Sequence, residues 1–338
     1  MKSFLQLTDL APERLEAVLK RARELESAPV NEALKGKVVG LLFMNPSLRT
    51  LASMQAGVAQ LGGSSFVIQP GAGSWKLETR DGAVMDQDAV EHIREGIPVL
   101  AEYCDALAVR CFAEGKALTA DLADPLIKQM ASLCPKPFVS LESAMAHPCQ
   151  ALGDWKTLED YEIPRKNGHF VLSWAWHPKA LPYAVPASAL QMAVQRGMNV
   201  TILRPDGYSL PAPVMAEAHA LAARSGASIR ETGDPKAGME GAHVLYVKSW
   251  AHPDYYGNPE AEAHLRAELR HDWCARESWF ATARKDAKLM HCLPVRRNVK
   301  IADELLDGPR SVVVKQAGNR LHAQKALLME MLSNRRSA

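Results

Sequence analysis

The chain has 338 residues and a mass of 37.0 kDa, which at ~150 residues per domain predicts about two domains. A composition of 47% hydrophobic and 23% charged residues is that of an ordinary globular protein and excludes a disordered or fibrous chain. The formal net charge of +2 argues against a protein that coats nucleic acid, so we expect no nucleic-acid partner. A small anion remains a plausible ligand, because a few arginines can be focused in one cleft.

The chain shows no signal peptide and no apolar run of about 18 residues, so we expect no membrane span and no membrane partner. The six cysteines form no Cys-x-x-Cys pair, and the eleven histidines form no His-Glu-x-x-His motif. This pattern favours reduced thiols in a cytoplasmic protein. It gives no support for a metal site.

Helical and strand-like segments alternate in the first half of the chain. Apolar residues at helical spacing predict a helix over 12–26, and the nearly all-apolar run at 38–44 suits a buried parallel strand. A long irregular segment is expected at 70–88. The other predicted elements are strands at 65–69, 105–110 and 137–143 and helices at 49–61, 89–103, 122–133 and 148–162.

The second half repeats this alternation after a connector at 161–168 that is rich in Pro, Gly and charge. Strands that alternate with helices predict parallel sheets, so we expect an α/β protein with two doubly wound parallel-sheet domains. Ligands of such sheets bind beyond the carboxyl ends of the strands. The predicted strands are 169–176, 199–205, 228–232, 243–250 and 311–315, and the predicted helices are 184–197, 212–225 and 319–334.

The segment after the first long strand has the composition of a phosphate site. Asn45-Pro46-Ser47-Leu48-Arg49-Thr50 leads directly into a predicted helix, whose free N–H groups and dipole favour an anion. Ser47 and Thr50 add hydroxyls, and Arg49 adds a two-pronged donor. The ordinary alternative is a serine cap with a solvent-facing arginine.

Polar or aromatic side chains also follow the next strands of the same predicted sheet. They are Trp75, Arg110, Glu142 and His147. Each alone is compatible with a structural role, such as a helix cap or a surface anchor. Their convergence on one face of one sheet predicts a functional site.

Three motifs resemble, in order and spacing, the signatures of the aspartate/ornithine carbamoyltransferase family. They are Ser47-Leu48-Arg49-Thr50, His147-Pro148-Cys149-Gln150 and His291-Cys292-Leu293-Pro294. The resemblance covers nearly the whole chain. It implies the carbamoyltransferase fold, with a carbamoyl phosphate domain at 1–160, an acceptor domain at 161–318, and helix 319–334 packing back on the first domain. It further implies a homotrimer with active sites shared between subunits. The residues it assigns to carbamoyl phosphate are Ser47, Leu48, Arg49, Thr50, Trp75, Arg110, His147, Pro148, Cys149, Gln150, Cys292, Leu293 and Arg320.

The second domain resembles the branch of the family that acts on acylated ornithine. Enzymes for free ornithine usually carry Asp-x-x-x-Ser-Met-Gly, whereas this chain reads Val247-Lys248-Ser249-Trp250. A lysine suits a carboxylate beside a neutral amide better than it suits a free α-ammonium. By this resemblance Trp75 comes from the neighbouring subunit, and Glu142, His177, Lys248 and Arg296 hold the acylated ornithine.

One position is expected to select the acyl group. In the resembling enzymes it carries Glu with N2-acetylornithine and Pro with N2-succinylornithine, and here it is Val90. A facing Glu would repel the extra carboxylate of a succinyl group and a valine would not, so we favour N2-succinylornithine over N2-acetylornithine. Lys300 matches a lysine that is carbamylated in some acetylornithine enzymes, although an ordinary exposed lysine is an equal alternative. Leu51 stands where the family usually has Arg.

The implied reaction belongs to arginine biosynthesis and needs no cofactor. The δ-amine attacks carbamoyl phosphate, and Arg49, Thr50, Arg110 and His147 stabilise the oxyanion and the departing phosphate. Two other classes stay open. A dinucleotide-dependent oxidoreductase would need G-x-G-x-x-G, for which Gly71-Ala72-Gly73 is only a fragment. A catalytically silent binding protein is supported only by Leu51.

Overall fold

The computed structural model describes residues 1–332 and divides into two compact units. Unit 1 comprises Met1–Ala113, Ala123–Gly153 and the described residues from Arg320 onward. Unit 2 comprises Glu114–Leu122 and Asp154–Asn319. The chain passes between the units within two continuous helices, α6 (Pro148–Asp160) and α12 (Val313–Leu332), and at both ends of the segment Glu114–Leu122. Residues 333 and 334 of the predicted helix 319–334 lie outside the described residues.

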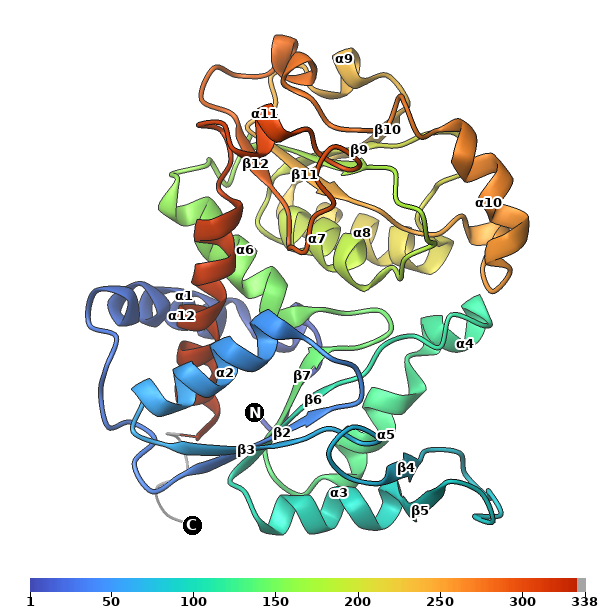
Figure 1. The fold of residues 1–338 in the computed structure, drawn as a ribbon. Coiled ribbons are helices and arrows are strands. Elements are labelled where there is room, and N and C mark those ends of the chain that lie inside the picture. Colours follow the sequence, from blue (N-terminus) through green and yellow to red (C-terminus); the bar gives the residue numbers. More distant parts are fainter. Residues whose placement is uncertain (333–338) are drawn as a thin grey trace. The chain divides into compact units, whose positions relative to one another are not determined.

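Unit 1 is built on a five-stranded parallel sheet in the order β1-β7-β6-β2-β3. The strands form where the sequence is nearly all apolar, because both faces of a doubly wound sheet are covered by helices. Helices α3 and α5 cover one face, with a core of Ile97, Leu107, Met130 and Phe138, and α2 lies on the opposite face (Figure 1). The strands are β1 (Ser3–Phe4), β2 (Val38–Phe43), β3 (Ser64–Ile68), β6 (Ala106–Arg110) and β7 (Phe138–Glu142), and the helices are α1 (Pro12–Ser27), α2 (Leu48–Gln60), α3 (Ile93–Glu102) and α5 (Pro125–Leu133).

Unit 2 repeats this architecture with a second parallel sheet, ordered β10-β9-β8-β11-β12. Helices α7 and α8 cover one face of it (Figure 1). The strands are β8 (His169–Trp174), β9 (Asn199–Leu203), β10 (Ile229–Thr232), β11 (Val244–Lys248) and β12 (Lys288–Met290). The helices are α7 (Ala184–Gln195), α8 (Ala212–Ser225), α9 (Pro235–Gly238), α10 (Pro259–Glu268) and α11 (Asp303–Leu306), while α4 (Leu118–Ala123) begins in the segment that joins this unit. The expectation of an α/β fold with two doubly wound parallel sheets is confirmed.

One predicted element is wrong, and the helix predicted at 89–103 begins later than expected, as α3 at Ile93. The valine run 311–315 is not a strand: Val312 N–H donates to the Leu289 carbonyl, and α12 begins at the next residue. Packing overrides the strand preference of valine here, because Val313 is buried while Val314 is 79% exposed. Residues 89–92 are not helical either. They form β5 (Ala89–His92), which pairs with β4 (Lys76–Glu78) in a small ribbon. No helix within residues 1–332 combines the length and apolar content needed to cross a membrane.

Candidate functional site

The amino end of α2 is organised around Ser47 and Thr50. The Ser47 hydroxyl caps the helix by accepting the Thr50 N–H at 3.2 Å. The Thr50 hydroxyl is fully buried and accepts from Arg320 Nη2 at 2.8 Å. Arg320 lies on α12, so two helices far apart in sequence meet at the helix end that carries Arg49. The Leu48 side chain is 81% exposed. The contact with carbamoyl phosphate that the resemblance predicts for Leu48 would therefore involve its backbone rather than its side chain.

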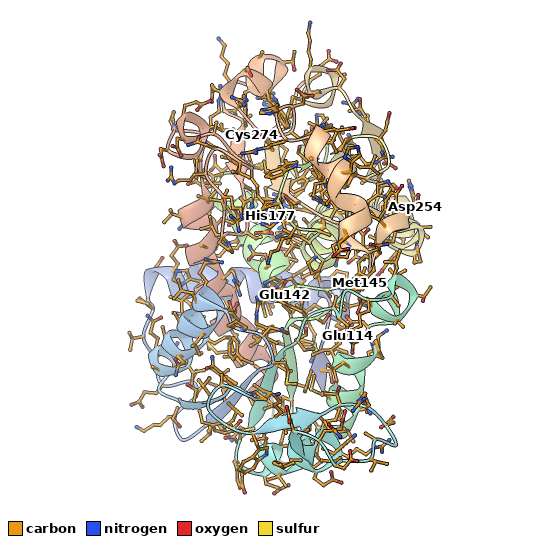
Figure 2. The ribbon with its side chains drawn as sticks, turned by 45° about the vertical axis from the view of Figure 1, so that its right-hand side comes forward. Glu114, Glu142, Met145, His177, Asp254 and Cys274 are labelled. Atoms are coloured by element: carbon orange, nitrogen blue, oxygen red, sulfur yellow. The ribbon has the colours of Figure 1, made fainter. Side chains whose placement is uncertain are left out.

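Arg110, Glu142 and His147 form a second group at the carboxyl ends of β6 and β7. Arg110 and Glu142 are partners in the sheet register, and their side chains form an ion pair. Nε2 of His147 lies 3.3 Å from the same Glu142 carboxylate, and the Arg110 guanidinium covers the Phe112 ring at 4.4 Å. Figure 2 labels Glu142 at the end of its strand. The Glu142 carboxylate, whose side chain is 12% exposed, thus contacts both of the donors that were predicted to face a carbonyl oxygen.

Asp124 was missed by the sequence reasoning, although it anchors the loop that carries His147. It adopts a left-handed backbone (φ +48°) just before α5. Its carboxylate accepts the Ser143 hydroxyl and the N–H groups of Ala144 and Met145, at 3.2 and 3.3 Å. Met145 is labelled in this loop in Figure 2. The sequence signal, Asp before Pro, reads as an ordinary helix start.

The His147-Pro148-Cys149-Gln150 motif begins α6, with Pro148 as its first residue. Cys149 is 1% exposed, and its thiol lies 3.6 Å from the Ser140 carbonyl oxygen, to which it donates. Burial raises the pKa of Cys149 to about 12, which rules out a thiolate nucleophile at neutral pH. Gln150 is also buried.

Trp75 directly precedes β4, and Val90 lies in β5, the other strand of the β4–β5 ribbon of unit 1. The Trp75 indole N–H donates to Glu91 at 2.6 Å, and Val90 occupies the register shift between the two strands. Both side chains are open to solvent, Trp75 at 58% and Val90 at 67% exposure. A neutral side chain is therefore displayed at the position expected to select the acyl group.

Unit 2 gathers four basic residues beyond the carboxyl ends of its strands. His177 follows β8, Lys248 ends β11, and Arg296 and Lys300 follow β12. Arg296 Nε donates to His177 Nε2 at 3.2 Å, while His177 Nδ1 lies 2.9 Å from the Lys179 carbonyl oxygen and 3.0 Å from the Lys179 backbone nitrogen. Burial, with the nearby cations, lowers the pKa of His177 to about 4. Burial, with Lys248 and Arg296, lowers the pKa of Lys300 to about 7. The positive charge of Lys248 and Arg296 in this cluster has the chemistry to attract carboxylates.

The third motif precedes this cluster in the chain. The His291 ring accepts the Leu293 N–H at 2.8 Å, and the His291 N–H donates to Gln316 at 2.9 Å. Leu293 has a φ of +53° and is followed by a cis peptide bond to Pro294. Cys292 is 7% exposed. The hydrogen bonds of His291 and Leu293 fix the backbone conformation on both sides of Cys292.

The predicted residues therefore lie in separate groups: the α2 end, the Glu142 group and the ribbon in unit 1, and the basic cluster with the third motif in unit 2.

Lys300 is only 2% exposed, so the alternative of an ordinary exposed lysine is wrong. Among residues 1–332 no three His, Cys, Asp or Glu side chains gather as a metal-binding group.

Comparisons with known proteins agree over the whole chain. Residues 2–160 match the family model of the aspartate/ornithine carbamoyltransferase carbamoyl-P binding domain, and residues 184–331 match that of the Asp/Orn binding domain. N-acetylornithine carbamoyltransferase of Xanthomonas campestris is 37% identical, over 99% of each chain. N-succinylornithine carbamoyltransferase of Bacteroides fragilis is 32% identical, also over 99% of each. A crystal structure of acetylornithine transcarbamylase with acetylcitrulline matches with a TM-score of 0.94 at 37% identity, covering 98% of this chain and 99% of that one.

Proposed function

Because this chain belongs to the aspartate/ornithine carbamoyltransferase family, in its acylornithine branch, we propose that it carbamoylates N2-succinyl-L-ornithine. The products would be N2-succinyl-L-citrulline and phosphate, in arginine biosynthesis. The chain is a carbamoyltransferase by family, so only the acceptor and the residue roles are proposed here. The observation that carries the choice of acceptor is Val90, a neutral and exposed side chain.

Overall similarity points toward N2-acetylornithine, the second candidate, since the acetylornithine relatives are 37% identical and the succinylornithine relatives 32%. Identity averages over the whole chain, whereas a choice between acyl groups depends on the few side chains that face the extra carboxylate. Variants of N-acetyl-L-ornithine transcarbamylase with one glutamate replaced by Pro, Ala, Ser or Val have been crystallised with carbamyl phosphate and N-succinyl-L-norvaline. We take Val90 to correspond to that glutamate, which supports succinylornithine.

Carbamoyl phosphate is proposed to bind at the strand ends of unit 1. Arg49 and the N–H groups at the start of α2 would hold the phosphate, supported by Ser47 and Arg320. Thr50, Arg110 and His147 would donate to the carbonyl oxygen as it becomes an oxyanion. The other proposed contacts are Leu48, Trp75, Pro148, Cys149 and Gln150, with Leu293 and the backbone carbonyl of Cys292.

The δ-amine then attacks the carbonyl carbon, the C–O bond to phosphate breaks, and phosphate takes the amine proton. No side-chain nucleophile is needed in this scheme. The buried, protonated Cys149 thiol fits it. Leu51, which replaces a usual arginine, leaves the donors of Arg49 in place.

The acylated ornithine is proposed to bind through His177, Lys248 and Arg296, with Glu142 near the reacting amine. Succinylornithine carries two carboxylates, which complement a basic cluster that lowers the pKa values of His177 and Lys300. The missing Asp and Ser-Met-Gly argue against a free α-ammonium.

Lys300 is proposed to be open to carbamylation. With a pKa of about 7, much of its amine is neutral at pH 7–8 and can add to carbon dioxide with loss of a proton. The product is an anion among Lys248 and Arg296, where a cation is disfavoured. Enzyme purified in ¹³C-bicarbonate should then show a carbamate carbon resonance that Lys300→Arg lacks.

The assembly is proposed to be a homotrimer with shared sites in the cytoplasm. Six buried free thiols suit a reducing compartment. Trp75 and Val90, exposed on their ribbon, suit a role in the neighbouring subunit's site.

Substrate kinetics test the acceptor. We expect kcat/KM to be higher for N2-succinylornithine than for N2-acetylornithine, and low for ornithine. Val90→Glu should reverse the preference by about a hundredfold or more, because it places like charges together. Val90→Gln is the matched control, with the length of Glu but no charge, and should disturb succinylornithine much less. A wild-type preference for the acetyl substrate would instead establish the second candidate.

A further inference from the structure

Helix α10, which the sequence reasoning did not find, carries the buried ion pair of Arg266 and Glu262. We propose that Arg266 is a positioning residue for the acylated ornithine, because it joins the loop that carries His177 to the loop that directly follows Lys248. The inference rests on the proposed function in one respect, that these two residues bind the acceptor.

The guanidinium of Arg266 donates to backbone carbonyls of both loops. Nη1 donates to the carbonyl of His177 itself at 3.3 Å, in the loop after β8. Nη2 donates to the carbonyl of Trp250 at 3.1 Å, two residues beyond Lys248 in the loop after β11. The same Trp250 carbonyl accepts the Trp174 indole N–H at 3.0 Å, which ties it to the end of β8. β8 and β11 are already paired up to Trp174 and Lys248, and Arg266 links the backbone just beyond these two strand ends.

The surroundings of Arg266 fix its orientation. It is 2% exposed, and its guanidinium carbon lies 5.4 Å from the Trp174 ring centre and 5.3 Å from that of Tyr208. Glu262, 1% exposed, balances the charge and also accepts the His252 N–H at 3.1 Å. A buried charge with a partner, aromatic faces and backbone acceptors has little freedom to move.

Lysine cannot reproduce this arrangement. The planar guanidinium presents five N–H donors in a fixed fork, whereas an ammonium is a single point at the end of a flexible stem. Arg266→Lys keeps the charge opposite Glu262 but cannot reach both carbonyls and the carboxylate together. The two loops should then shift relative to one another, and His177 and Lys248 with them.

Arg196→Lys provides the matched control. Arg196 is a second buried arginine of unit 2, 5% exposed, that pairs with Glu159 at 3.0 Å and donates to the carbonyls of Pro164 and Ile163. Those carbonyls precede β8, so they lie before the amino end of the strand and not at the carboxyl end that leads to His177. Both substitutions remove a buried guanidinium fork, but only one of them touches the loops at the proposed acceptor residues.

The experiment measures steady-state kinetics and thermal melting of the full-length enzyme. It compares wild type with three single variants, His177→Ala, Arg266→Lys and Arg196→Lys. We expect both lysine variants to lower the melting temperature to a similar extent. Arg266→Lys should raise the KM for acylornithine about tenfold or more, because displaced binding groups are lost from ground state and transition state alike. Its KM for carbamoyl phosphate should change less than about twofold, and Arg196→Lys should alter neither KM. Glu262→Gln keeps the shape of the side chain but removes the charge that holds Arg266, so it should raise the KM for acylornithine about threefold. This variant tests the proposal if Arg266→Lys does not fold.

The outcomes separate this inference from the proposed function. If His177→Ala leaves the KM for acylornithine unchanged, the assignment of the acceptor site is wrong. If His177→Ala raises that KM while Arg266→Lys and Glu262→Gln behave like Arg196→Lys, Arg266 is structural only and the positioning role is overturned.

Discussion

Two buried lysines of unit 2 have opposite electrostatic surroundings. Lys300 is 2% exposed and faces Lys248 and Arg296, so burial and like charge lower its pKa to about 7. Lys156 is fully buried but lies 2.8 Å from the carboxylate of Asp160. Two lysines of nearly equal burial therefore have different neighbours, a carboxylate beside Lys156 and two cations beside Lys300.

This contrast predicts how stability depends on pH. The pKa of Lys300 is about 10.5 unfolded and about 7 folded, so between these values the unfolded chain binds more protons and stability rises with pH. Below pH 7 Lys300 is protonated in both the folded and the unfolded chain, so the full free-energy cost of burying its charge destabilises the fold. Lys300→Met should therefore raise the melting temperature at pH 6–7 and reduce its rise between pH 7 and 10. Thermal melting in bicarbonate-free buffer, with the lysine unmodified, measures this.

Lys156→Met is the control for removal of a buried lysine. It leaves the Asp160 carboxylate without its nearest cation, so the melting temperature should fall by the equivalent of about 3 kcal/mol. If Lys300→Met destabilises the protein at pH 6 as Lys156→Met does, then the ammonium of Lys300 has a favourable partner and the low pKa is wrong.

At the residue scale, the sequence could place several candidate residues relative to the strands, but it could not give their hydrogen-bond and ion-pair partners. Arg110, Glu142 and His147 could be placed at strand ends, because apolar runs reveal where strands stop. Glu142 contacts both Arg110 and His147. This arrangement depends on the sheet register and on the conformation of the loop before His147. Asp124 contacts residues about twenty positions later, and no local pattern encodes such a contact.

At the scale of elements, the loop between β7 and α6 depends on Asp124. Asp124→Asn replaces one acceptor oxygen by a donor, so the Ser143 hydroxyl and the N–H groups of Ala144 and Met145 lose part of their anchor. We expect a loss of about 2 kcal/mol in stability and a fall in kcat of about tenfold, because His147 is displaced. Kinetics at saturating substrate and chemical denaturation measure the two effects.

Asp121→Asn separates the two effects. Asp121 is as buried as Asp124, at 6% against 8% exposure, and its carboxylate accepts the N–H groups of Glu114 and Gly115 and the Tyr256 hydroxyl. Its substitution should cost similar stability with kcat preserved. A wild-type kcat in Asp124→Asn would mean that the loop keeps its course without this carboxylate.

Helices and strands could be predicted where the sequence carries one clear pattern, either an apolar run or apolar residues at helical spacing. The buried strands β2 and β6 and the amphipathic α1 follow from apolar runs and helical spacing. The strand predicted at 311–315 failed because the strand preference of three valines is weak against tertiary packing, which here starts α12 at Val313 and leaves Val314 exposed. The ribbon β4–β5 was missed because its strands are short and only partly buried, so they leave no apolar run in the sequence.

At the scale of the whole molecule, apolar side chains concentrate in one exposed segment. Within residues 74–92, Trp75, Val84 and Val90 are 58%, 79% and 67% exposed, and Met85 is 39% exposed. A monomer rarely leaves such side chains together in water, and a second copy of the chain would cover them. This supports the proposal that Trp75 completes the site of a neighbouring subunit.

Mixing two inactive variants tests that proposal. In a shared site, Trp75 comes from one chain and His147 from its neighbour, so Trp75→Ala and His147→Ala damage different contributions to one site. After equal mixing with free subunit exchange, a site is intact when its own chain carries His147 and its neighbour carries Trp75. Each condition holds in half of the cases, so about a quarter of the wild-type activity should return. Mixing Arg110→Ala with His147→Ala should restore nothing, because both residues then belong to the same chain's contribution. Mass spectrometry verifies the exchange, and if mixed trimers form without recovery, Trp75 serves only the site of its own chain or no site at all.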